Sequence, residues 1–244
     1  MLALVFAAGV WAGFQNALAG GGSFVTLPAL ILAGLNPLAA NITSTVALFP
    51  SYVISGWAGR SMVSGVGQLG FRALFVLSVA GGALGGVLLL ATPSTLFARL
   101  VPWLVLFATA VFAWGSFARR GEAHERIGVR ATAAAQFLIA VYGGYFGGGI
   151  GFLMMAALTM AGLSVRHAGA TKNALSGVLN ASAVLLFLFS PQLHWREAAL
   201  LGAGAVAGGW LGAHALNRVP ERALRIGVIV LGVALTIGLF AKPI

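Results

Sequence analysis

The stretch that decides the fold is Gly147-Gly148-Gly149-Ile150-Gly151-Phe152, a cluster of glycines in the middle of a long apolar run. A shorter version, Gly20-Gly21-Gly22-Ser23-Phe24, interrupts another apolar run near the start of the chain. Each interrupted run is too long for one membrane span of about 20 residues and too short for two. Because glycine disfavours a helix interior by about 1 kcal/mol per residue, each cluster predicts a broken helix.

The composition places most of the chain in a membrane. Of its 244 residues, 60% are hydrophobic and 7% are charged, whereas soluble domains carry about 25% charged residues. Apart from the two broken runs, the stretches predicted to cross the membrane are 41–57, 71–90, 96–117, 168–189, 198–215 and 224–241, the first of them slightly short. We therefore expect an all-α integral membrane protein.

The two glycine clusters belong to a repeat that runs through the whole chain. Ala33-Gly34-Leu35 matches Ala161-Gly162-Leu163, and Thr43 aligns with Thr171. Further on, the glycine-rich stretch 81–86 aligns with 208–213, and all of these matches lie 127 or 128 residues apart. The chain is therefore predicted to hold two membrane repeats, residues 1–117 and 131–244, joined by the polar linker 118–130.

The basic residues predict the topology of each repeat. Cytoplasmic loops are enriched in lysine and arginine, and the linker carries Arg119, Arg120, Arg126 and Arg130, so we expect it in the cytoplasm. If Arg166 shares that side, the glycine-broken segment must enter and return as a re-entrant hairpin, although two full spans are the alternative. Each repeat is then one hairpin plus three spans. Since three is odd, the repeats are inverted, an architecture typical of transporters.

The acidic residues limit the chemistry of the cargo. The chain has only Glu122, Glu125, Glu197 and Glu221, and all fall in predicted loops. A membrane interior without carboxylates argues against a cation pump or a carboxylate proton relay. The absence of cysteine excludes disulfides and thiolate metal sites, and we expect no cofactor. The net charge of +10 reflects topology rather than nucleic-acid binding, so an anion or a neutral solute is the expected cargo.

Each glycine break is expected to start a new half-helix, at Phe24 and at Phe152. Helix N-termini present unpaired N–H groups and a partial positive charge. Two such ends that enter from opposite membrane faces would converge on one central anion site. The alternative is that the glycines only allow close helix packing.

Polar groups near the breaks complete the predicted site. Lys172 is the strongest candidate, because a lysine inside a membrane is costly without an anion; the alternative is that its side chain reaches the interface. Hydroxyl and amide donors suit an oxyanion, although they also hydrogen bond between helices. Gln15 and Asn16 precede the first break and are expected nearby. The predicted binding residues are Gly20, Gly21, Gly22, Ser23, Asn41, Thr43, Ser44, Gly147, Gly148, Gly149, Thr171, Lys172 and Asn173.

The duplicated order of glycine cluster, apolar half-segment and threonine-containing helix start resembles the sulfite exporter TauE/SafE family. The motifs that carry the resemblance are 19–28 with 41–45, and 143–152 with 169–173, and it covers nearly the whole chain. It implies a transporter of sulfur oxyanions or organosulfonates, such as sulfite and sulfoacetate, in a bacterial inner membrane. The halves differ where Lys172 stands against Ser44, so the binding site is expected to be asymmetric.

The predicted function is a secondary transporter, an exporter of a small anion that works by alternating access around a midplane site. An anion channel and a transporter of another small solute are the alternatives. An intramembrane enzyme built on Ser23 and His214 is the remote one, because the duplicated break already explains Ser23. The expected partners are the anion and the lipid bilayer. Coupling to a proton or sodium and a homo-oligomeric state stay open.

Overall fold

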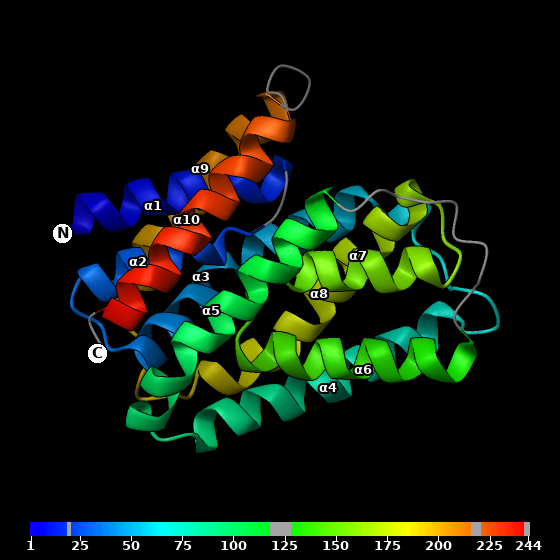
Figure 1. The fold of residues 1–244 in the computed structure, drawn as a ribbon, viewed down its shortest axis with the longest axis horizontal. Coiled ribbons are helices and arrows are strands. Elements are labelled where there is room, and N and C mark those ends of the chain that lie inside the picture. The colour runs from blue at the N-terminus through cyan, green and yellow to red at the C-terminus, as the bar shows by residue number, and fades with distance from the viewer. Residues whose placement is uncertain (19–20, 118–127, 216–220, 242–244) are drawn as a thin grey trace.

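The computed structural model describes residues 1–18, 21–117, 128–215 and 221–241 (Figure 1). The first repeat is folded into α1 (Leu2–Leu18), α2 (Ser23–Leu32), α3 (Pro37–Ala58), the short 3-10 turn η1 (Arg60–Met62), α4 (Phe71–Ala91) and α5 (Ser94–Phe117). The second is folded into α6 (Val129–Tyr145), α7 (Ile150–Met160), α8 (Val165–Phe187), α9 (Trp195–Ala215) and α10 (Glu221–Ala241). The all-α prediction is confirmed.

Both glycine clusters break a helix, as predicted. The half-helices that follow them, α2 and α7, begin at Ser23 and Ile150, one and two residues before the expected positions. The next helix of each repeat, α3 or α8, is also capped by a residue at an equivalent position. Asn36 accepts a hydrogen bond from the Ala39 N–H (2.9 Å) at the start of α3, and Ser164 caps α8 in the same way. Side-chain caps of this kind satisfy N–H groups that lack partners within the helix.

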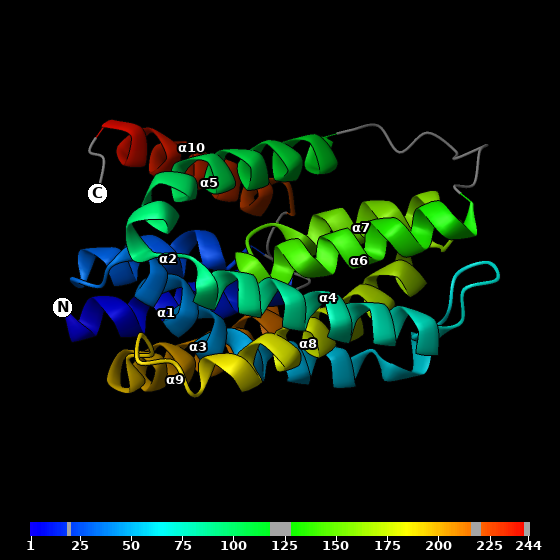
Figure 2. The same cartoon turned by 90° about the horizontal axis from the view of Figure 1, so that it is seen from below.

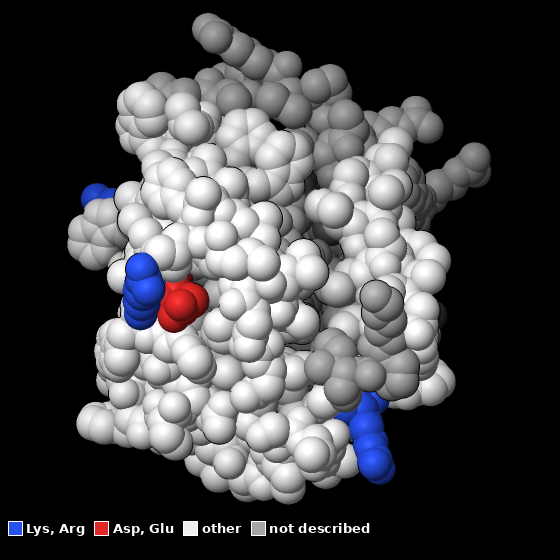
Figure 3. Space-filling model, turned by 90° about the vertical axis from the view of Figure 1, so that its left-hand side faces the viewer, with Lys and Arg blue, Asp and Glu red and all other residues white. Residues whose placement is uncertain are grey.

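Length and composition mark several helices as membrane spans. Within the described residues, α3, α4 and the 94–114 part of α5 are long and apolar enough to cross a membrane. The surface agrees, because large apolar side chains such as Val76, Trp103 and Phe189 are exposed. Figure 3 shows a face on which charged side chains occur only at isolated points. The chain is therefore a multi-pass membrane protein.

The most extensive helix contacts join the two repeats. α1 lies against α9, and its equivalent α6 lies against α4; α3 packs on α8, and α5 packs on α10. If each helix is replaced by its equivalent in the other repeat, the same helix pairs are obtained. Figures 1 and 2 show α5 and α10 side by side, in a layer on one side of the two hairpins α1–α2 and α6–α7.

The equivalent helices at the centre run antiparallel. Gly56 of α3 lies beside Ala174 of α8, and Gly59, one turn later, lies beside Ala170, one turn earlier. The α5–α10 pair is also antiparallel, since Trp103 contacts Phe240 (ring centroids 5.1 Å apart) while Thr109 lies beside Gly232. This antiparallel relationship is compatible with inverted repeats, which stay a prediction together with their sidedness in the membrane.

Glycines form the two closest helix contacts. In α1, Gly9 and Gly13 lie against the backbone of α9 at Leu201 and Ala205, and Gly208 of α9 lies against the Val10 carbonyl. The equivalent contact joins α4 and α6, through the glycines Gly81, Gly85 and Gly144. Small residues allow this approach in membranes. The duplicated stretches 81–86 and 208–213 therefore serve helix packing, and the two contacts are called the glycine seams below.

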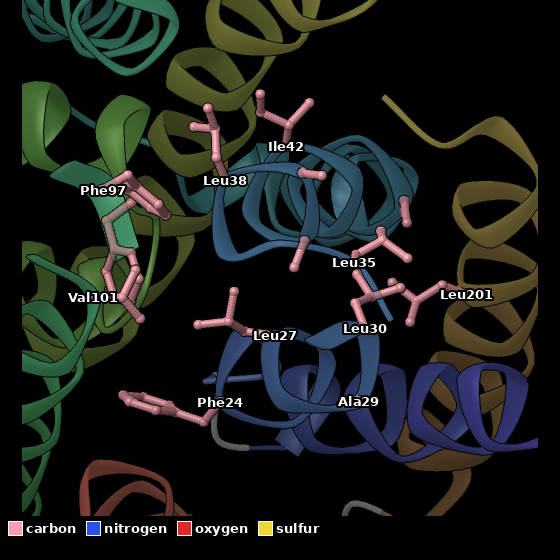
Figure 4. Packing of buried hydrophobic residues seen from close by; sticks show 14 of the residues in the cluster. Phe24, Leu27, Ala29, Leu30, Leu35, Leu38, Ile42, Phe97, Val101 and Leu201 are labelled. Atoms are coloured by element: carbon pink, nitrogen blue, oxygen red, sulfur yellow. The ribbon is translucent and has the colours of Figure 1, made fainter. Parts of the chain in front are cut away.

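The largest buried cluster surrounds the first half-helix. Phe24 and Leu27 of α2 point toward Phe97 and Val101 of α5 (Figure 4). On the other side of α2, Leu30 lies close to Leu201 of α9. All of these side chains are almost completely buried. The half-helix is therefore held between helices of both repeats, which fixes the position of its N-terminus at the first glycine break.

Candidate substrate-binding site

A cavity of about 40 Å³ lies where the two glycine breaks meet in the interior of the protein. Its wall comes from both breaks and from the antiparallel helices α3 and α8. A single water needs roughly 10–15 Å³ of such space, so the cavity has room for a few waters or one small anion. The lining residues are Asn16, Gly21, Ser23, Ser51, Tyr52, Ser55, Gly147, Gly149, Ile150, Gly151, Phe152, Lys172, Asn173 and Ser176.

The first break is shaped by Asn16 at the end of α1. Its Oδ1 accepts a hydrogen bond from the Gly22 N–H (2.8 Å), whereas its Nδ2 is buried and has no partner. Gly21 has a left-handed conformation (φ +85°), which glycine adopts without strain. A Cβ on Gly22 would lie 2.8 Å from the Asn16 Nδ2, so only glycine leaves room for the amide. Ser23, the first residue of α2, lines the cavity together with Tyr52 of α3.

The second break presents the N-terminus of α7 to the cavity. Gly147 and Gly149 are both left-handed (φ +79° and +77°), and the N–H groups of Phe152 and Leu153 donate back to the Gly149 carbonyl (3.1 and 3.4 Å). The first N–H groups of a helix have no partner within it. In α7 these belong to Ile150 and Gly151, and both residues line the cavity. This helix end therefore offers hydrogen-bond donors and a partial positive charge.

Lys172 points at that same helix end. Its Cδ and Nζ each lie 3.6 Å from the position that a Cβ on Gly151 would occupy. The side chain is thus directed into the cavity. Glu197, whose carboxylate lies 3.9 Å from the His194 ring, is not among the residues that line the cavity. In the described part of the chain, Lys172 has no carboxylate partner.

The structure brings together six of the predicted binding residues. Gly21, Ser23, Gly147, Gly149, Lys172 and Asn173 all line the cavity. Gly22 and Gly148 belong to the breaks but do not form its wall, and Gly20 lies outside the described residues. Asn16, expected near the first break, is part of the wall. Gln15 is buried beside it, where its Oε1 accepts a hydrogen bond from the Trp11 ring N–H (3.1 Å).

The other four predicted residues are buried away from the cavity and bind protein groups. Asn41 donates to the Tyr145 carbonyl (3.1 Å), and the hydroxyl of Ser44 is 2.6 Å from that of Thr26. Thr43 and Thr171, which are equivalent in the two repeats, each bind the backbone of a loop in the other repeat; the Thr43 Oγ1 accepts from the His194 N–H (3.2 Å). The hydrogen bonds of Thr43 and Thr171 therefore join the two repeats.

The sequence alone did not single out the serines Ser51, Ser55 and Ser176, or Tyr52. A usable signal existed for Ser51 and Ser55, because residues four apart in a span share one helix face. In the structure they donate to carbonyls of their own helix, at Leu48 (2.7 Å) and Ser51 (2.8 Å) respectively. Rotation about one bond would turn either hydroxyl toward the cavity.

The comparisons with known proteins agree with this architecture. The family model described as sulfite exporter TauE/SafE matches residues 5–239. The chain is 30% identical to the probable membrane transporter protein ORF9 of Sinorhizobium sp over 247 residues, which cover 100% of this chain and 94% of that protein. It is 27% identical to a probable membrane transporter protein of Haemophilus influenzae, over 97% of this chain and 93% of the relative.

A more distant relative is the probable membrane transporter protein YfcA of Escherichia coli, which is 22% identical over 97% of this chain and 88% of its own length. No solved structure matches the chain. Both the matched family and the names of these relatives describe membrane transporters rather than enzymes. The chain therefore belongs to the sulfite exporter TauE/SafE family, and it is a membrane transporter.

Proposed function

We propose that this transporter carries one small anion at a time through the cavity between the two glycine breaks. The observation that carries the proposal is the Lys172 ammonium at the N-terminus of α7. Two positive features that converge in a membrane interior repel each other. An anion between them would remove that repulsion and would accept charge-assisted hydrogen bonds from both. No carboxylate among the described residues takes that role.

Neutral donors complete the proposed site. The side chains of Asn16, Asn173 and Ser176 supply amide and hydroxyl groups around the cavity, and such groups suit the oxygens of an oxyanion. The N-terminus of α2 faces it from the first repeat, where Ser23 lines the wall. Because Asn41, Thr43, Ser44 and Thr171 already bind protein groups, the proposed site leaves them out.

The family supports a sulfur oxyanion or an organosulfonate as the substrate, with sulfite and sulfoacetate as the examples to test, and export as the direction. The proposed setting is a bacterial inner membrane with the linker 118–130 in the cytoplasm, where the arginines of the linker favour that side. The proposed mechanism is alternating access, in which the two repeats rock about the central site and expose it to one side at a time.

Binding measurements on the purified full chain test the proposal. Calorimetric titration with sulfite, sulfoacetate, thiosulfate and chloride should show saturable binding of at least one of the three sulfur anions, at an affinity well above that for chloride. Lys172→Ala should weaken this binding about tenfold or more, as expected for loss of a charged hydrogen bond. Arg166→Ala is the matched control, since Arg166 is on the same helix but exposed.

Two results would contradict the proposal. If none of the sulfur anions binds, the proposed site does not serve this class of substrate. If Lys172→Ala binds like the unchanged protein, the lysine is not part of the site. Transport assays in liposomes separate the transporter from a channel, because a channel would give a flux that does not saturate with the anion concentration.

A further inference from the structure

We propose that Lys172 also carries a proton, so that each anion crosses the membrane together with one H⁺. This inference rests on the proposed function above and concerns the coupling ion of the same site. Its basis is the position of the ammonium, in an interior cavity and against the positive end of α7. Once the anion has left, no negative group among the described side chains balances the positive charge of the ammonium.

The neighbours of Lys172 contain no acid that could act in its place. On α3, Tyr52 lines the cavity. On α6, the ring of Tyr142 packs against Phe107 and Phe146. α7 has no titratable residue. The second tyrosine of α6, Tyr145, is half-buried, and its hydroxyl lies 3.3 Å from that of Thr92. The other charged or titratable groups on α8 or on the elements that pack against it are exposed: Arg60 on η1, Arg72 on α4, Arg130 on α6, and Arg166 and His167 on α8 itself.

The proton then follows the anion in a balanced cycle. With the anion bound, the lysine is –NH₃⁺ and its charge is paired. When the anion leaves, the N–H bond breaks heterolytically, the proton passes to water on the side to which the cavity is open, and –NH₂ remains. The empty protein therefore returns without a buried positive charge, whose transfer through a membrane interior is costly. On the other side, the amine takes up a proton and the site takes up an anion.

The asymmetry of the repeats sets the stoichiometry at one proton. The position equivalent to Lys172 in the first repeat is Ser44, whose hydroxyl is 2.6 Å from that of Thr26. A serine there adds no second ammonium to the cycle. A monovalent anion would thus cross with no net charge, and a divalent anion with one net negative charge. A lysine suits this role because its ammonium can lose a proton, whereas arginine stays charged.

Proton movement is measured directly in liposomes that contain the purified protein and a trapped pH-sensitive dye. Thiosulfate and sulfoacetate are suitable probes, because their charge does not change near neutral pH and they carry no proton themselves. An inward gradient of either anion, with the voltage clamped at zero by potassium and valinomycin, should acidify the interior. The ratio of protons to anions taken up should be one.

Lys172→Arg provides the decisive variant. It keeps the positive charge but cannot release the proton, so anion binding and anion-for-anion exchange should persist, because exchange never requires the empty protein to return. Net uptake and interior acidification should fall more than tenfold. Lys172→Gln should lose affinity by about tenfold, and any residual uptake should move no protons. Arg166→Lys, at the exposed start of the same helix, should behave like the unchanged protein in all three assays.

The outcomes separate this inference from the proposed function. Saturable binding and uptake without acidification would overturn proton coupling and leave the anion site standing. Net uptake with full acidification in Lys172→Arg would likewise show that another group carries the proton. Absence of any binding of thiosulfate and sulfoacetate, when sulfite does not bind either, would overturn both proposals together.

Discussion

Thr171 of α8 binds both backbone polar groups of Ser64, in the loop that follows α3. Its Oγ1 accepts from the Ser64 N–H (3.1 Å) and donates to the Ser64 carbonyl (3.2 Å). Thr171 is completely buried, so both bonds are shielded from water. One hydroxyl thus fixes a loop of the first repeat to a helix of the second, next to the residue that points into the cavity.

Thr171→Val should therefore destabilise the protein without touching the cavity wall. The valine has the same shape, but the Ser64 N–H and carbonyl would lose their partner, which costs about 1–3 kcal/mol for buried groups. We expect a lower midpoint in thermal unfolding in detergent. Thr171→Ser, which keeps the hydroxyl, should unfold close to the unchanged protein, and equal midpoints for serine and valine would contradict the role of these hydrogen bonds.

The glycine seam between α1 and α9 predicts a sharp difference between neighbouring residues. A Cβ at Gly208 would overlap the Val10 carbonyl, whereas a Cβ at Gly209 would meet nothing nearer than the Gly13 carbonyl at 3.9 Å. Gly208→Ala should separate the helices and sharply lower the yield of folded protein, judged by size-exclusion chromatography. Gly209→Ala should leave the yield unchanged, and the seam is misassigned if the two variants behave alike.

Asn16 tests the charge of the proposed site. Asn16→Asp keeps the oxygen that accepts from the Gly22 N–H, but it replaces the unpartnered Nδ2 by a negative charge at the cavity. The first break should persist, while the affinity for a sulfur anion should fall at least tenfold through like-charge repulsion. Asn36→Asp is the control, because Asn36 caps α3 and is exposed outside the cavity. An unchanged affinity in Asn16→Asp would count against anion binding there.

Gly147 tests the left-handed backbone of the second break. Its φ is +79°, and the nearest atom to an added Cβ is the Gly143 carbonyl oxygen at 3.5 Å, so the space is sufficient and only the conformation is strained. Gly147→Ala should cost about 1–2 kcal/mol and lower the unfolding midpoint. Gly147→Asn should cost less, because asparagine tolerates this region. If side-chain volume rather than φ determined which residues this position accepts, Gly147→Ala would instead have the higher unfolding midpoint of the two variants.

The inverted topology is accessible to labelling, since the natural chain contains no cysteine. Single substitutions Arg120→Cys and Arg222→Cys should react with a membrane-impermeant thiol reagent from the cytoplasmic face only. Opposite faces for the two positions would refute the predicted arrangement of hairpin and three spans. Ser61 of η1, whose side chain is exposed, gives a reference label at a described position, in the first repeat between α3 and α4.

Much of the fold follows from the sequence, because membrane helices leave long apolar stretches. The predicted span 71–90 is α4 to within one residue, and 198–215 shares its end with α9. Both breaks also follow, since three consecutive glycines strongly disfavour a continuous helix. Lys172 and the glycines near it could be assigned to one site because they are close in the chain and are chemically distinct from their surroundings.

The α3 side of the cavity could not be predicted in the same way. Aligning the repeats pairs Ser44 with Lys172, which suggests that both lie at one centre. In the structure α3 and α8 are antiparallel, with Gly56 beside Ala174. Lys172 and Ser176 therefore share the cavity with Ser51 and Ser55, and Ser44 lies elsewhere. The relative position of two helices depends on side-chain packing between them, and this information is absent from the alignment of one with the other.

The glycine seams have a consequence for a single repeat considered on its own. Each seam joins the hairpin of one repeat to a helix of the other, α1 to α9 and α6 to α4. In this chain the partner of each hairpin helix therefore lies in the other repeat. A repeat taken alone would close its seam in the same way only by pairing with a second copy of itself.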